Sequence, residues 1–94
     1  MISTTSPQKF RSRQILITPT AQEQLSSTDV QQALRRHLSG DWGDCGPEDA
    51  AANESALLHG ERLLSVYHAA SGTKFWIITE ADRSATTVLM PDDY

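Results

Sequence analysis

The clearest hydrophobic period of the chain lies in its first half. After the polar residues 27–29, which supply capping oxygens, the residues recurring at helical spacing are Val30, Ala33, Leu34, His37 and Leu38. Spacing at i, i+3, i+4, i+7 and i+8 predicts an amphipathic helix over residues 28–39, which Gly40 would end in a left-handed conformation. Because His37 lies on the apolar stripe, we expect it to be a partly buried packing residue.

A second, weaker helical pattern covers residues 47–59. Pro47 occupies the first helical position, Glu48 and Asp49 follow in the first turn, and Gly60 comes directly after the segment. Proline at the start, acids near the positive end of the helix dipole and glycine after the end are typical helix boundaries. The apolar face of this helix is mostly alanine, so we expect it to pack closely and to contribute little stabilisation.

The last third of the chain changes to strand-like composition. Three runs rich in β-branched and aromatic residues cover residues 62–68, 73–79 and 85–90, and short polar segments join them. Such runs with hairpin-length joins predict a three-stranded antiparallel meander. Both faces of the middle run are largely apolar, which indicates a central strand.

A short apolar segment, residues 14–18, predicts a further strand that ends at Pro19, followed by a short helical turn. The expected fold class is therefore α+β: a three- to four-stranded antiparallel sheet packed against two helices. The core would contain inward-facing residues of both layers, namely Leu34, Leu38, Leu64, Val66, Phe75, Ile77 and Val88.

The length of the chain permits one domain. A protein of 94 residues buries only about 60–65% of the surface that its unfolded chain exposes, which is enough for one core. Residues 1–13 are polar and contain Lys9, Arg11 and Arg13, so they predict a flexible N-terminal tail. Residues 14–94 would form the single α+β domain.

The charge of the chain argues against a nucleic-acid partner. The formal net charge is −4, and outside the expected tail 5 basic residues stand against 12 acidic ones. Binding through Arg35, Arg36 and the basic tail would have to overcome this excess of acids. We therefore expect no nucleic-acid partner.

The expected location is the cytoplasm, without a membrane association. Apolar runs such as residues 75–78 fall far short of the roughly 20 residues that span a bilayer, and the N-terminus lacks the pattern of a secretory signal. Cys45 is the only cysteine, so the chain cannot form an internal disulfide, which suits a reducing compartment.

The sequence predicts no catalytic residue, no cofactor and no metal site. No two of His37, His59 and His68 are separated by three or four residues, and one cysteine with three histidines does not make a zinc-finger pattern. The chain also lacks a phosphate-binding loop, a paired-glycine fingerprint and a nucleophile elbow.

Two polar loops are the candidates for a binding site. Residues 40–46 place three glycines and two aspartates around Trp42, which either folds back onto the core to anchor the loop or contacts a partner. The second loop, residues 80–84, is a charged turn between two expected strands. The expected partner-binding residues are Asp41, Trp42, Asp44, Glu80, Asp82 and Arg83.

Three segments resemble small bacterial proteins labelled plasmid-related or hypothetical. They are Gly40–Asp44, Gly60–Tyr67 and, above all, Gly72–Pro91, and the resemblance extends over residues 15–94. It implies an accessory protein of mobile DNA elements such as plasmids and prophages. It implies no catalytic residues.

The function expected from the sequence is that of a non-enzymatic accessory protein of mobile elements that binds a protein partner. One alternative is an acidic DNA mimic that inhibits a defence nuclease, because the net negative charge permits such a role. Another is a small metal-dependent nuclease that uses Glu80, Asp82 and Arg83. The sequence leaves the oligomeric state open.

Overall fold

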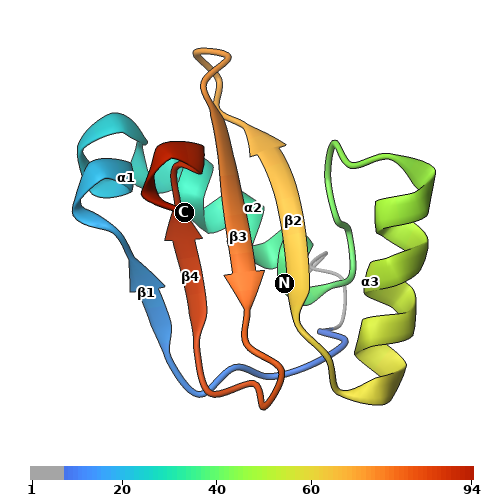
Figure 1. Cartoon of the computed structure of the whole chain (residues 1–94). Helices are drawn as coiled ribbons and strands as arrows, with labels where there is room; N and C mark the ends of the chain where they lie inside the picture. The colour runs from blue at the N-terminus through green and yellow to red at the C-terminus, as the bar shows by residue number, and fades with distance from the viewer. Residues whose placement is uncertain (1–7) are drawn as a thin grey trace, which may run out of the picture.

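The structure, a computed structural model, describes residues 8–94 and has the predicted α+β fold (Figure 1). Along the chain, its elements are β1 (Ile15–Ile17), α1 (Pro19–Gln24), α2 (Ser27–Leu38), α3 (Pro47–His59), β2 (Leu63–His68), β3 (Lys74–Thr79), β4 (Thr86–Leu89) and a short 3₁₀ helix, η1 (Pro91–Asp93). None of the helices in this part of the chain is long and apolar enough to cross a membrane.

The four strands form one sheet in the order β1-β4-β3-β2. Strands β2, β3 and β4 make the predicted antiparallel meander, but β1 pairs parallel with β4, so the sheet is mixed. Hairpin joins fix neighbouring strands antiparallel, whereas three helices separate β1 from the meander and leave its direction free. The sequence predicted the fourth strand, but the expectation that the whole sheet would be antiparallel is wrong for β1.

Helices α1 and α2 cover one face of the sheet, and η1 lies on the other (Figure 1). Helix α2 begins at the Ser26 cap, whose Oγ accepts a hydrogen bond from the Asp29 amide at 3.1 Å. Phe75, Ile77 and Val88 of the sheet are buried beneath the helices, as expected. The buried residues of this layer are Ala21, Leu25, Ala33, Tyr67, Phe75, Ala69, Ile77, Val88 and Met90.

The predicted facing of β2 is wrong. Leu63, Ser65 and Tyr67 point to the helix layer and are buried, whereas Leu64 and Val66, expected in the core, lie partly exposed on the opposite face. The prediction placed Leu63, Ser65 and Tyr67 toward solvent because they are the more polar of the two alternating sets. Inside the fold those polar groups have partners: Ser65 bonds to a histidine, and the Tyr67 hydroxyl donates to a backbone carbonyl at 2.5 Å.

His37 joins α2 to three strands. Its side chain is fully buried, with Nδ1 at 2.5 Å from Ser65 Oγ and Nε2 at 2.8 Å from Thr79 Oγ1, which in turn bonds to Thr86 Oγ1 at 2.7 Å. Burial, together with the positive charge of Arg83, lowers the pKa of His37 to about 4. The imidazole is therefore neutral at pH 7 and is buried more completely than the sequence predicted.

Part of the segment expected to be a flexible tail is bonded to the domain. The Lys9 amide donates to the Leu38 carbonyl at 2.7 Å, and the Arg13 amide donates to the Arg83 carbonyl at 3.1 Å. Between them, the Phe10 ring packs edge-on against His37 with centroids 5.5 Å apart. A lone aromatic residue in a polar segment has no hydrophobic period that would predict this. The remainder of the expected tail, residues 1–7, lies outside the described residues.

The outer edge of β2 is covered. The Asn53 side chain of α3 accepts a hydrogen bond from the Leu64 amide at 3.0 Å and donates one to the Leu64 carbonyl at 2.7 Å, as a neighbouring strand would. Further along the edge, the Val66 amide donates to Trp42 O at 3.1 Å, and Val66 O accepts from the Asp44 amide at 2.7 Å. These bonds fix α3 and the loop before it beside the sheet.

Candidate binding groove

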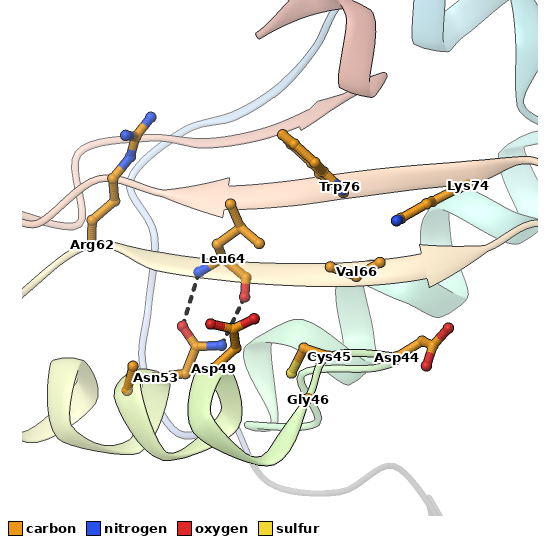
Figure 2. Close-up of a pocket in the computed structure, with 11 residues that line it drawn as sticks. Asp44, Cys45, Gly46, Asp49, Asn53, Arg62, Leu64, Val66, Lys74 and Trp76 are labelled. Carbon is orange, nitrogen blue, oxygen red and sulfur yellow. Dashed lines mark hydrogen bonds between the residues drawn. The ribbon is translucent and has the colours of Figure 1, made fainter.

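A groove of about 550 Å³ lies between α3 and the face of the sheet opposite α2 (Figure 2). The loop and α3 contribute Asp44, Cys45, Gly46, Asp49, Ala52 and Asn53, and the sheet side contributes Arg62, Leu64, Val66, Lys74 and Trp76. A hollow of this volume is within the range of ligand sites in proteins. The sheet supplies an apolar floor and two cations, and the helix side supplies small residues and two acids.

Strand alternation creates the floor of the groove. Leu64 is paired with Ile78, and Val66 is paired with Trp76, so these side chains share the face that α1 and α2 do not cover. On the opposite wall, small side chains such as Ala52 leave space between the helix and this floor.

The indole nitrogen of Trp76 is buried and has no hydrogen-bond partner. Among the described residues, it is the one buried side-chain nitrogen or oxygen in that state. Leaving such a donor unsatisfied costs about 1–3 kcal/mol. The ring itself packs edge-on against Tyr94 with centroids 5.6 Å apart. Figure 2 shows the nitrogen end of the ring toward Lys74, whose long side chain can move aside for an acceptor.

Two of the predicted binding residues, Glu80 and Asp44, lie near opposite ends of the groove. At the start of β2, Arg62 Nε is 3.8 Å from Glu80 Oε1, and Nη1 donates to the Tyr94 hydroxyl at 2.9 Å. At the end of β2, His68 Nδ1 is 3.6 Å from Asp44 Oδ2, an ion pair when the histidine is protonated. These pairs are exposed and contribute little stability. Their charges therefore remain accessible to a bound partner.

Asp41 and Trp42 hold the loop in place. Asp41 pairs with Arg36 at 2.8 Å, and this hydrogen bond lowers the pKa of the Asp41 carboxyl. Trp42 is 5% exposed, donates from Nε1 to Glu54 Oε2 at 2.7 Å, and packs edge-on against His37. The anchoring interpretation of this tryptophan is confirmed.

The predicted residues of the second loop point in different directions. Asp82 is exposed at the tip of the turn and accepts a hydrogen bond from the Ser84 amide at 3.0 Å. Hydrogen bonding to the side chain and then to the amide of Ser84 lowers the pKa of the Asp82 carboxyl. Arg83, at φ +63°, folds back, and its guanidinium donates to the carbonyl of Glu61 at 2.6 Å and that of Ala56 at 3.2 Å. The guanidinium thus ties the turn to the end of α3.

Within residues 8–94, no group of three or more His, Cys, Asp or Glu side chains is placed to hold a metal ion. Cys45 contributes a thiol, a potential nucleophile, to the groove. Burial and the nearby Asp49 carboxylate raise the pKa of its thiol. The thiol is therefore protonated at neutral pH and is a weak nucleophile.

Sequence reasoning missed most of the groove. Of the predicted binding residues, Asp44 alone lines it, whereas Arg62, Lys74 and Trp76 were not selected. The alternation of β2 and β3 was the available signal, because it places these residues on one face. The length and place of the covering helices decide whether that face is open, and no local pattern contains this information.

Comparisons with models of protein families, with curated proteins and with solved structures found no match.

Proposed function

We propose that the protein is a non-enzymatic binding protein whose groove between α3 and the sheet holds an extended segment of a protein partner. The observation that supports this most strongly is the composition of the groove, which joins an apolar floor, an unsatisfied buried donor and unpaired charges. Recognition sites combine these features, because apolar area gives affinity and polar groups fix orientation.

The groove favours a peptide with two features. A large apolar side chain would pack on Leu64, Val66 and Trp76, and a carbonyl oxygen would accept the free indole hydrogen. Lys74 and Asp49 form no ion pair with any described residue, so they are free to select opposite charges on the segment. Such rim charges mainly set the association rate and its salt dependence.

A binding role agrees with the low reactivity of Cys45 and with the burial of His37. The Cys45 thiol is protonated, and His37 is fully buried in bonds to hydroxyl groups, out of reach of a ligand in the groove. The resemblance to plasmid-related proteins supports an accessory role in a mobile DNA element. The single cysteine supports a cytoplasmic setting for that role.

A peptide-display selection tests the proposal. A random-peptide library is selected on the protein, and enriched peptides are measured against the variants Ala52→Arg and Ala51→Arg. Both alanines are exposed on α3, but only Ala52 lines the groove. We expect Ala52→Arg to weaken binding at least about tenfold, equivalent to about 1.4 kcal/mol, and Ala51→Arg to change it less than about twofold.

Cys45 gives an independent readout. Because it is the only cysteine and lines the groove, a bound peptide should slow its alkylation by N-ethylmaleimide, in the wild type and in Ala51→Arg. No enriched peptide, or peptides that bind both arginine variants equally, would contradict the proposal. DNA cleavage that needs Mg²⁺ or Mn²⁺ and is lost in Glu80→Gln and Asp82→Asn would favour the nuclease alternative instead. Inhibition of a nuclease that DNA relieves by competition would favour the DNA mimic.

A further inference from the structure

Strand β1 forms the other edge of the sheet, and no described element lies beyond it (Figure 1). Its three consecutive residues are large, apolar and exposed: Ile15 at 48%, Leu16 at 42% and Ile17 at 37%. Proteins usually protect an edge with charges, bulges or a covering segment. This protein covers the β2 edge with Asn53 and a loop, and leaves the β1 edge open.

The free backbone groups of β1 form a symmetric set. Toward β4, the Thr86 amide donates to Gln14 O at 2.8 Å and the Thr18 amide donates to Val88 O at 3.0 Å. Since successive residues of a strand direct their amide and carbonyl groups to opposite sides, Ile15 and Ile17 direct theirs to the open edge. One amide donor and one carbonyl acceptor thus point to the open edge on each side of Leu16.

We propose that β1 pairs antiparallel with β1 of a second copy of this chain, about a two-fold axis that passes beside Leu16. Ile15 would face Ile17 of the second copy and exchange two hydrogen bonds with it, and the symmetric pair would exchange two more. The two Leu16 side chains would meet at the axis on the same face. The pairing joins two four-stranded sheets into one of eight strands.

A second copy fits this edge for two reasons. Antiparallel self-pairing in this register satisfies all the outward groups of Ile15 and Ile17 in both copies. A register shifted by two residues would place one of them opposite Arg13, whose amide already donates to Arg83 O, or opposite Pro19, which has no amide hydrogen.

The ends of the strand also carry opposite charges. Arg13 precedes the strand, and its charge adds to the hydrogen bonds from Ser84 in lowering the pKa of Asp82. Asp93, whose Oδ2 accepts a hydrogen bond from Thr18 at 2.6 Å, lies at the other end. Antiparallel pairing brings Arg13 of each copy toward Asp93 of the other.

The interface is small. Stable complexes bury about 800 Å² on each partner, more than an edge of three residues provides. We therefore expect a dimer that forms only at high concentration. Strands β3 and β4 separate this edge from β2 and the groove, so dimerisation and peptide binding are measured independently.

Sedimentation velocity on the whole chain tests dimerisation between about 10 µM and about 1 mM. The wild type should shift from monomer to dimer across this range, and Leu16→Lys should remain monomeric because its charge would meet itself at the axis. The control Leu58→Lys adds the same charge at a residue that is 83% exposed on α3, and should dimerise as the wild type does. A wild type that is monomeric at every concentration, or a dimer unaffected by Leu16→Lys, would overturn the proposal.

Disulfide trapping tests the register, because the covalent bond retains a dimer that would otherwise dissociate. In a Cys45→Ser background, Leu16→Cys should crosslink into a covalent dimer under mild oxidation, because the two Cα atoms would lie about 4.5 Å apart in a non-hydrogen-bonded pair. In this register residue 15 of one copy faces residue 17 of the second, so two cysteines at the same position would not face each other. Ile15→Cys and Ile17→Cys should therefore crosslink at least about tenfold more slowly than Leu16→Cys. Equal rates for the three variants would refute the two-fold register, even if a dimer forms.

Discussion

Acidification below pH 6.5 should destabilise the protein through His37. The folded-state pKa of this residue is about 4, against 6.5 for a histidine in water, because the imidazole is buried without a negative partner. Between these two pH values the unfolded chain binds a proton that the folded chain excludes. The stability that neutral His37 contributes is therefore complete above pH 6.5 and is lost as the pH falls toward 4.

The magnitude follows from the two pKa values. A difference of this size corresponds to about 3 kcal/mol when the titration is complete. Between about pH 7.5 and about pH 5, the free energy of unfolding should fall by about 2 kcal/mol from this residue. Hydrogen bonds also lower the pKa values of Asp41, Asp82 and Asp93, but these carboxyls lose their contribution below about pH 4 and so affect this interval little.

The assay is urea unfolding, followed by circular dichroism, at a series of pH values. His37→Gln retains a side chain that can donate and accept hydrogen bonds but cannot be protonated, so its free energy of unfolding should vary much less over the same interval. The control His59→Gln removes an exposed histidine of α3 and should keep the wild-type pH dependence. Equal pH dependence in the wild type and His37→Gln would refute the assignment of the effect to the buried imidazole.

Two further predictions concern the covered edge of β2. Gly43→Ala should lower the free energy of unfolding by about 3 kcal/mol or more, because φ is +76° and an added Cβ would overlap the Val66 carbonyl oxygen. The control Gly60→Ala, at φ +67° in open space, should lower it by only about 1–2 kcal/mol. Equal losses for the two variants in urea unfolding would contradict this prediction. Asn53→Ala should cost about 1–3 kcal/mol by removing both side-chain bonds to the Leu64 backbone. Hydrogen exchange at the Leu64 amide should rise in this variant, and unchanged protection would show that the asparagine does not cover the edge.

The helices were predictable because their signals are local. The stripe from Val30 to Leu38 gives α2, and Pro47 with Gly60 gives the limits of α3. Each of these signals concerns a residue and its neighbours within one or two turns, where capping and periodicity act. The meander was predictable for a similar reason, since its joins are too short for anything but hairpins.

The facing of β2 and the position of Arg83 were decided by tertiary structure. Ser65 is buried because His37, 28 residues away, bonds to its hydroxyl. Arg83 folds onto the carbonyls of Ala56 and Glu61 because the fold places these acceptors beside the turn. In both cases the partner that makes burial favourable is distant in sequence, so polarity alone assigned these side chains to solvent.

The sequence by itself determined the α+β class, the helices and the meander. The tertiary structure decided the rest: the parallel direction of β1, the open face that makes Trp76 the floor of a groove, and the contrast between a covered and an exposed sheet edge. The physical reason is the distance along the chain over which each interaction acts. Periodicity, capping and turn chemistry act between residues close along the chain, whereas an open face or a free edge depends on which distant segments reach it.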